Sequence, residues 1–162
     1  MKKTCLIFRK KDCMGCHACE VACKQEHALG VGPRLVRIVE KSPEFIPVYC
    51  HHCAKPPCRA ACPAQAISRT EQGIVLIDEG LCIGCRECVE ACPFGAMQFE
   101  DHREVAVKCD LCRHRLAESK LPACMSVCPT GCIGLGATKN IAAVFEKPTS
   151  RETAFHGSGS AS

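Results

Sequence analysis

The stretch CIGCRECVEACP, residues 82–93, decides the fold because it spaces four cysteines as C-x2-C-x2-C-x3-C-P: Cys82, Cys85, Cys88 and Cys92. The first three thiolates lie on a tight loop in which Gly84 gives the backbone conformational freedom, so they can reach three corners of one cubane [4Fe-4S] cluster. A zinc ion instead requires four ligands arranged as a tetrahedron around one point. The fourth cysteine lies beyond this loop, and Pro93 helps to turn the chain there because it lacks an N–H. In two-cluster proteins such a fourth cysteine binds the neighbouring cluster, so one run implies a second.

Three further cysteine runs bring the total in runs to sixteen of the eighteen cysteines. The first run is Cys13, Cys16, Cys19 and Cys23, which repeats the spacing of residues 82–92 but has Lys24 in place of the proline. The second run is Cys50, Cys53, Cys58 and Cys62, whose longer second spacer contains Pro56 and Pro57. The fourth run is Cys109, Cys112, Cys124 and Cys128. We therefore predict four [4Fe-4S] clusters, since such triplets and repeated C-P elements do not suit zinc ribbons.

The cysteine content is also compatible with two other classes of protein. Eighteen cysteines in 162 residues could form a disulfide scaffold, as in small secreted proteins, or could hold structural zinc. Against secretion, the apolar run Cys5–Phe8 is too short for a signal peptide, so we expect a reducing, cytoplasmic location. No apolar stretch approaches the roughly 18 residues that cross a bilayer, so we expect no direct membrane insertion. A zinc protein would be colourless and rich in zinc.

Composition and charge indicate that metal clusters hold the chain together. Only 4% of the residues are aromatic and none is Trp, so folding should depend on cluster insertion. The formal charge of +4 becomes roughly −4 if four oxidised clusters each contribute about −2. The basic side chains beside the runs then compensate negative charge and can tune reduction potentials: Lys10, Lys11, Arg86, Lys108, Arg113 and Arg115. We therefore expect no nucleic-acid partner.

The segments between the runs predict short strands and few helices. We expect extended segments at residues 5–8, 34–40, 45–49, 74–78 and 104–107. The first run lacks the C-P stop, so a helix could extend through Glu26 toward Gly30. A short helix is expected at residues 140–147, followed by a flexible polar tail at residues 149–162.

An internal repeat accounts for the two remaining cysteines. The segments at residues 62–67, 92–97 and 128–133 align residue for residue, and Cys132 falls on Ala66 and Ala96. Cys5 stands eight residues before the first run, as Ile74 does before the third. Both cysteines are therefore expected to be buried structural residues.

No catalytic machinery is evident in the sequence. Each run is complete, so no iron is left open for a substrate, and fully ligated clusters carry out one-electron transfer. His51 and His52 lie inside the second run, where four cysteines leave them a surface or supporting role. There is no Gly-rich phosphate loop and no Ser-His-Asp set. The sequence predicts a non-catalytic electron carrier.

The succession of the four runs resembles a specific family. Together with the Pro56-Pro57-Cys58 element and the segments around Lys108, Arg115 and Pro122, it is similar to the four-cluster iron–sulfur subunits of molybdenum and tungsten pterin oxidoreductases. The resemblance covers roughly residues 5–136. It implies an α+β fold of two small, loop-rich, bacterial-ferredoxin-like units.

The resemblance implies which runs pair. In that family the outer runs share two clusters and the inner runs share two. Two outer clusters follow: Cys13, Cys16, Cys19 and Cys128 for one, and Cys109, Cys112, Cys124 and Cys23 for the other. Two inner clusters follow: Cys50, Cys53, Cys58 and Cys92 for one, and Cys82, Cys85, Cys88 and Cys62 for the other. The outer unit would span residues 1–47 and 104–136, and the inner unit residues 48–103, with residues 137–162 forming the C-terminal helix and tail.

The resemblance also implies partners. The cluster begun by Cys13 would face a large Mo/W-pterin catalytic subunit, and the other end would meet a flavoprotein, a ferredoxin or a membrane partner. Relatives with a three-iron cluster lack the second cysteine of the third run, whereas Cys85 is present here. The short chain favours a soluble complex, for which the small subunit of a tungsten aldehyde oxidoreductase is the preferred example. The alternative is a stand-alone polyferredoxin or a hydrogenase-linked electron carrier.

Overall fold

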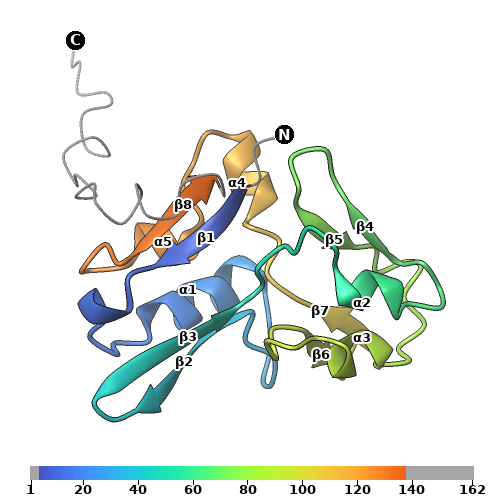
Figure 1. Cartoon of the computed structure of the whole chain (residues 1–162), viewed down its shortest axis with the longest axis horizontal. Helices are drawn as coiled ribbons and strands as arrows, with labels where there is room; N and C mark the ends of the chain where they lie inside the picture. The colour runs from blue at the N-terminus through green and yellow to red at the C-terminus, as the bar shows by residue number, and fades with distance from the viewer. Residues whose placement is uncertain (1–3, 138–162) are drawn as a thin grey trace.

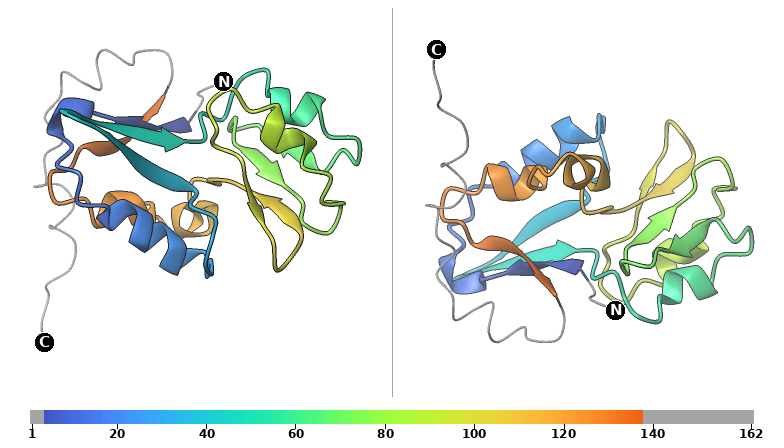
Figure 2. Two further views of the ribbon diagram at one scale, coloured as in Figure 1. Left: turned by 90° about the horizontal axis from the view of Figure 1, so that it is seen from below. Right: turned by 90° about the horizontal axis from the view of Figure 1, so that it is seen from above.

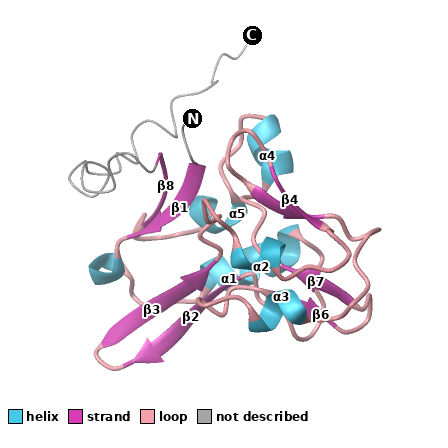
Figure 3. Ribbon diagram, turned by 45° about the vertical axis from the view of Figure 1, so that its right-hand side comes forward, coloured by secondary structure: helices cyan, strands magenta, loops and turns pink. Residues whose placement is uncertain are grey.

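A computed structural model describes residues 4–137 as a mixture of short helices and strands, in agreement with the expected α+β class (Figure 1). Long loops and turns connect these short elements, as the pink segments of Figure 3 show. The helix expected at residues 140–147 and the tail expected at residues 149–162 lie outside the described residues. Within residues 4–137, no helix is long and apolar enough to cross a membrane.

The strands of the described part form antiparallel pairs, with no larger sheet. The pairs are β1 (Thr4–Phe8) with β8 (Ile133–Ala137), β2 (Val36–Lys41) with β3 (Glu44–Tyr49), β4 (Ile67–Arg69) with β5 (Val75–Ile77), and β6 (Gln98–Glu100) with β7 (Val105–Val107). The β1–β8 pair joins the two ends of the described chain, so the fourth cysteine run returns to the first.

The helices differ in length for a reason that the sequence contains. The helical elements are η1 (Lys10–Asp12), α1 (Ala18–Glu26), α2 (Pro57–Ala60), α3 (Glu87–Glu90), α4 (Arg113–Ala117) and α5 (Ala123–Ser126). Pro93 disfavours the helical conformation for the residue before it, so α3 stops after one turn. Lys24 imposes no such stop, and α1 runs on to Glu26 as predicted.

The predicted strands are confirmed, but the strands that follow the C-P segments were missed. The extended segments expected at residues 5–8, 34–40, 45–49, 74–78 and 104–107 correspond to β1, β2, β3, β5 and β7. The sequence did not predict the strands β4, β6 and β8, nor the short helical elements η1, α2, α3, α4 and α5. Each missed strand begins at the last residue of an aligned C-P segment or one residue after it, so the repeat itself carried the signal.

The C-P segments also share a backbone turn. Gln65, Gly95 and Gly131 occupy the same position of the alignment and adopt φ angles of +53°, +58° and +61°. The left-handed conformation turns the chain from the last cysteine into the following strand. The repeat is therefore structural as well as sequential.

Buried apolar side chains form two clusters on either side of β7. The larger hydrophobic cluster contains α1 residues together with side chains of β1, β2 and β8. The smaller hydrophobic cluster gathers side chains of α2, α3, β4 and β5. Val105 and Val107 face the larger cluster, whereas Ala106 faces the smaller one, as alternation along a strand requires. In Figure 2 the elements of the larger cluster and those of the smaller cluster form two neighbouring groups, and β7 lies with the elements of the smaller cluster.

Candidate metal centres

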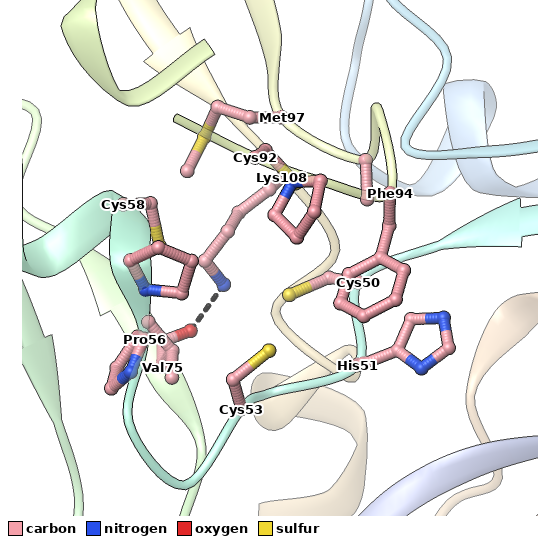
Figure 4. A pocket seen from close by; sticks show the side chains of 13 residues that line it. Cys50, His51, Cys53, Pro56, Cys58, Val75, Cys92, Phe94, Met97 and Lys108 are labelled. Atoms are coloured by element: carbon pink, nitrogen blue, oxygen red, sulfur yellow. Dashed lines mark hydrogen bonds between the residues drawn. The ribbon is translucent and has the colours of Figure 1, made fainter. Parts of the chain in front are cut away.

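Three cavities of similar size are each lined by four cysteines of the runs, drawn in each case from two different runs, and Cys132, outside the runs, also lines the third cavity. Their empty volumes are about 370, 330 and 300 Å³. The first is lined by Cys50, Cys53, Cys58 and Cys92; the second by Cys62, Cys82, Cys85 and Cys88; the third by Cys13, Cys16, Cys19 and Cys128. Figure 4 shows the thiols of Cys50, Cys53 and Cys58 in the first of these cavities. In each case the last cysteine of a run joins the triplet of another run.

The remaining four cysteines of the runs form a fourth group. Cys23, on α1, and Cys109, Cys112 and Cys124 are all buried. The nearby Cys124 and Cys112 thiols add to the effect of burial in raising the pKa of Cys23. Cys124 and Cys23 do the same to Cys109, as does Cys50 from the first cavity. Three groups of four cysteines thus line cavities, and the other four cysteines of the runs are buried and near enough to affect one another's pKa.

The loops that present the triplets owe their shape to glycine. Gly15 and Gly84 occupy the same place in the first and third runs and have φ angles of +69° and +70°. A β-carbon at Gly84 would lie 2.8 Å from the backbone oxygen of Glu104, and one at Gly15 would lie 2.3 Å from the Phe45 ring. Glycine therefore allows both the turn and the close approach of a second chain segment.

Burial makes these groups unsuited to free thiolates. Desolvation raises the pKa of Cys19 to about 12, that of Cys124 to about 12 and that of Cys88 to about 11. Negative charge on neighbouring cysteines, and on Glu20 beside Cys19, contributes to these pKa values because like charges repel. Thiolates at such sites need a positively charged core among them. Four sulfur donors around a largely apolar cavity fit an iron–sulfur cluster, which cysteine thiolates hold.

Both cysteines outside the runs are buried, as predicted. Cys5 lies in β1, and its thiol contacts the carbonyl oxygen of Gly136 on β8 at 3.7 Å. Cys132 is as buried as its counterparts Ala66 and Ala96. It also lines the cavity of the Cys13 group, with its Sγ 3.5 Å from that of Cys128. Its place beside a candidate ligand was not expected from the alignment.

Cys128 differs from the other candidate ligands in its surroundings. Burial opposes ionisation, but hydrogen bonds with Thr130 and Cys132 outweigh it and lower the pKa of the Cys128 thiol. Thr130 Oγ1 lies 3.6 Å from Cys128 Sγ. These two partners belong to the turn after Pro129, so the C-P segment supports the sulfur that precedes it.

Three histidines contact the candidate ligands or the loops that carry them. His27, at the end of α1, places Nε2 3.5 Å from the Sγ of Cys112, and no sequence pattern predicted this contact. His52 is fully buried and accepts a hydrogen bond at Nδ1 from the backbone N–H of Val75, at 3.0 Å. His51 stacks between Tyr49 and Phe94, with ring centroids 4.9 and 4.1 Å away. The expectation of surface or supporting roles fits both histidines of the second run.

The basic residues beside the runs are mostly exposed. Lys10, Lys11, Arg86 and Arg113 face solvent, and Arg115 is half-buried in an ion pair with Glu26. Lys108 alone among the six is buried. It lines the cavity of the Cys50 group (Figure 4).

Comparison with known proteins agrees with this geometry. Residues 42–138 match the family model described as a 4Fe-4S dicluster domain, and residues 10–26 match a 4Fe-4S binding domain. The chain belongs to the 4Fe-4S dicluster family. As a member of this family, the protein carries [4Fe-4S] clusters and transfers electrons through them.

Named relatives align with most of this 4Fe-4S dicluster protein. It is 40% identical over 142 residues to the thiosulfate reductase electron transfer subunit PhsB of Salmonella typhi, covering 81% of this chain and 74% of the relative. It is 36% identical over 140 residues to a subunit of the anaerobic dimethyl sulfoxide reductase of Escherichia coli, with 76% and 68% covered. It is 34% identical over 181 residues to formate hydrogenlyase subunit 2 of Escherichia coli, with 89% and 86% covered.

Proposed function

We propose that this protein is a non-catalytic subunit of an oxidoreductase complex. It passes single electrons along four [4Fe-4S] clusters between a Mo/W-pterin catalytic subunit and a second redox partner. The observation that carries the proposal is the arrangement of sixteen cysteines in four adjoining groups of four. Four complete ligand sets leave no iron open to a substrate, which supports a role without catalysis.

Each group of thiols is proposed to hold one cluster. The four sets are those that the family resemblance implies: Cys13, Cys16, Cys19 and Cys128; Cys109, Cys112, Cys124 and Cys23; Cys50, Cys53, Cys58 and Cys92; Cys82, Cys85, Cys88 and Cys62. The cavity linings support three sets, and the mutual effects of the buried thiols support the Cys109 set. When bound, the clusters supply one-electron redox chemistry.

Interactions between thiols of different groups support a linear order. The thiol of Cys19 raises the pKa of Cys124, which links the Cys13 set to the Cys109 set. The thiol of Cys50 likewise raises the pKa of Cys109, which links the Cys50 set to the Cys109 set. The thiol of Cys58 raises the pKa of Cys88, which links the Cys50 set to the Cys82 set. The proposed order is therefore the Cys13 set, the Cys109 set, the Cys50 set and the Cys82 set.

The exposure of the thiols supports exchange of electrons at both ends of this order. Cys16, in the first set, and Cys85, in the last, are the exposed cysteines of the chain. Apolar side chains stand beside them: Met14 is 59% exposed and Ile83 is 68% exposed. All four cysteines of the Cys109 set are buried. Electrons would enter and leave at the ends and pass through a protected middle.

We also propose two ferredoxin-like units, here called the outer region (residues 4–47 and 104–136) and the inner region (residues 48–103). All buried residues of the larger hydrophobic cluster belong to the outer region, which supports the division. In the smaller cluster only Ala106 comes from outside the inner region. The β6–β7 pair crosses the boundary and would connect the units.

The partner is inferred from the names of relatives. Thiosulfate reductase and dimethyl sulfoxide reductase favour a Mo/W-pterin reductase as the catalytic partner. A tungsten aldehyde oxidoreductase has no counterpart among the relatives described above. The flavoprotein or ferredoxin partner remains part of the proposal. Because cluster ligands must stay reduced, the proposal places the complex in a reducing compartment such as the cytoplasm.

Metal analysis of the complex tests the proposal. The complex is purified without oxygen from its native host, and iron, molybdenum, tungsten and zinc are measured per chain. We expect about sixteen irons on this chain, since four cubanes hold four irons each, and Mo or W on a co-purifying large subunit. The same iron without Mo or W would instead favour a polyferredoxin or a hydrogenase partner. Zinc in place of iron would overturn the proposal.

A further inference from the structure

Lys108 is a buried basic residue between two groups of cysteines. It follows β7 directly and precedes Cys109, a member of the buried Cys109 set. Its side chain is 7% exposed and lines the cavity of Cys50, Cys53, Cys58 and Cys92. In Figure 4 the Lys108 amine points into this region, between Cys58 and Cys50. The residue therefore adjoins both middle groups of the proposed order.

Hydrogen bonds hold the Lys108 amine in place. Its Nζ donates to the carbonyl oxygen of Val75, on β5, and to that of Cys109 at 3.0 Å. Val75 is almost completely buried, so this anchor is fixed. An ammonium group has three donors, so one remains available toward the cavity. The position of the charge is thus set by the fold and not by a flexible surface chain.

The charge of Lys108 has no carboxylate partner within residues 4–137. Asp110 and Glu79 line a neighbouring cavity with Lys108, but neither forms an ion pair with it. Burying an ammonium group is costly unless negative charge compensates it. Clusters with four thiolates carry about −2 each, and the two middle sets adjoin this residue. They are the compensating charge that the surroundings of Lys108 otherwise lack.

We propose that Lys108 is a fixed cation that raises the reduction potentials of the two middle clusters together. The inference rests on the proposed function, because it requires clusters on the Cys109 and Cys50 sets. Adding one electron makes a cluster more negative, and a nearby cation favours that state most strongly where water is excluded. A single charge beside both clusters also offsets the repulsion between them. Lys108 acts through the clusters, so it is a positioning residue for electron transfer.

The test compares Lys108→Met with Lys55→Met in the purified holo-protein. Lys55 lies in the same loop as Cys53, but it is exposed, so its removal takes away the same charge without altering a buried site. The potentials are measured by titration with dithionite, followed by electron paramagnetic resonance. In Lys108→Met we expect the reduced-to-oxidised ratio of two clusters, at a fixed solution potential, to fall at least about tenfold, or about 59 mV for one electron. In Lys55→Met the ratio should change less than about twofold.

Two further variants separate charge from hydrogen bonding. Lys108→Gln keeps an N–H donor but loses the charge, so it should shift the same two clusters as Lys108→Met. Lys108→Arg keeps the charge and should leave all potentials near those of the wild type. Unchanged potentials in Lys108→Gln, or equal shifts in Lys108→Arg and Lys108→Met, would overturn the proposal.

Iron content separates this inference from the proposed function. All variants should keep about sixteen irons per chain. Fewer clusters in the wild type would contradict the proposed function, whatever the variants do. Four clusters in the wild type with no dependence on Lys108 charge would contradict only the role of Lys108. If Lys108→Met loses iron, the Lys108→Gln and Lys108→Arg titrations decide the question.

Discussion

The outer and inner regions surround similar groups of thiols with different amounts of other structure. The outer region has the nine-residue helix α1, the six-residue strand β2, most of its partner strand β3, and the larger hydrophobic cluster. In the inner region the helices have four residues and the strands three, and its hydrophobic cluster is small. Apolar burial is the main stabilising term for a fold without metal. The inner region should therefore depend more on its clusters.

Removal of iron should give the largest effect. Chelation under reducing conditions should abolish amide protection in the inner region, whereas β1, β8 and α1 should keep part of theirs because of the larger hydrophobic cluster. Hydrogen exchange of holo- and apo-protein, resolved by peptide, measures the difference. Equal loss of protection in both regions would show that the outer core cannot hold without metal.

Replacing one candidate ligand in each region should give the next largest effect. Cys109 is buried in the outer region, and Cys85 is exposed in the inner region. Cys85→Ser should perturb the signal of one cluster and leave most iron bound. Cys109→Ser should lose at least about four of sixteen irons, because its site is enclosed and adjoins a second cluster.

Iron content and electron paramagnetic resonance of the two serine variants, with Cys5→Ser as a control outside the runs, check this ranking. Unchanged spectra in Cys85→Ser would contradict its assignment as a ligand. A greater iron loss in Cys85→Ser than in Cys109→Ser would reverse the ranking of buried over exposed sites.

Shortening α1 should give a smaller but clear effect. Lys24→Pro places a proline inside the helix and should destabilise the outer region by about 3 kcal/mol. Lys24→Ala is the matched control, since it loses only the hydrogen bonds of Nζ to the carbonyl oxygens of Gly30 and Pro33. It should lower the free energy of unfolding by less than about 1 kcal/mol. The midpoint temperature of cluster loss, followed by visible absorbance, measures both. Equal midpoints would mean that the extra turns of α1 contribute nothing.

The smallest predicted effect concerns a buried carboxylate in the outer region. Glu20 is buried and accepts hydrogen bonds from Arg34, His17 and the backbone of Ile38. Burial alone would raise the pKa of Glu20, but these bonds outweigh it and lower the pKa below 4.5. The hydrogen bond to Glu20 raises the pKa of His17 above 6.5. Stability from Glu20 is present above pH 4.5 and lost as the pH falls through its folded pKa. Stability from His17 is present below pH 6.5 and lost as the pH rises through its folded pKa.

Glu20→Gln should therefore lower the free energy of unfolding most where both groups contribute, by about 2 kcal/mol near about pH 5.5. Near about pH 8 the loss should be smaller. Midpoint temperatures of cluster loss at the two pH values measure the difference. Asp101→Asn, which breaks the exposed ion pair with Arg86, is the control and should change little at either pH. An equal loss of stability at both pH values would show that His17 makes no contribution.

The sequence alone determined the chemistry, the repeat and several elements. Cysteine spacing is local, so it predicted the [4Fe-4S] class, and the absence of a proline after Cys23 predicted the longer helix α1. The alignment of Cys132 with Ala66 and Ala96 predicted its burial. The strands β4 and β6 were missed because a three-residue strand carries too short an alternation to recognise. The five-residue strand β8 was missed because Gly134 and Gly136 interrupt its apolar pattern.

Other features depended on tertiary structure. The grouping of cysteines from different runs followed from family resemblance and not from spacing. The structure gathers the same groups, and their role as cluster ligands remains a prediction. The surroundings of Lys108, His27 and Cys132 depend on which distant segments meet. Six basic residues lie beside the runs, yet only the fold decides that Lys108 is buried, because burial depends on packing between segments far apart in the chain.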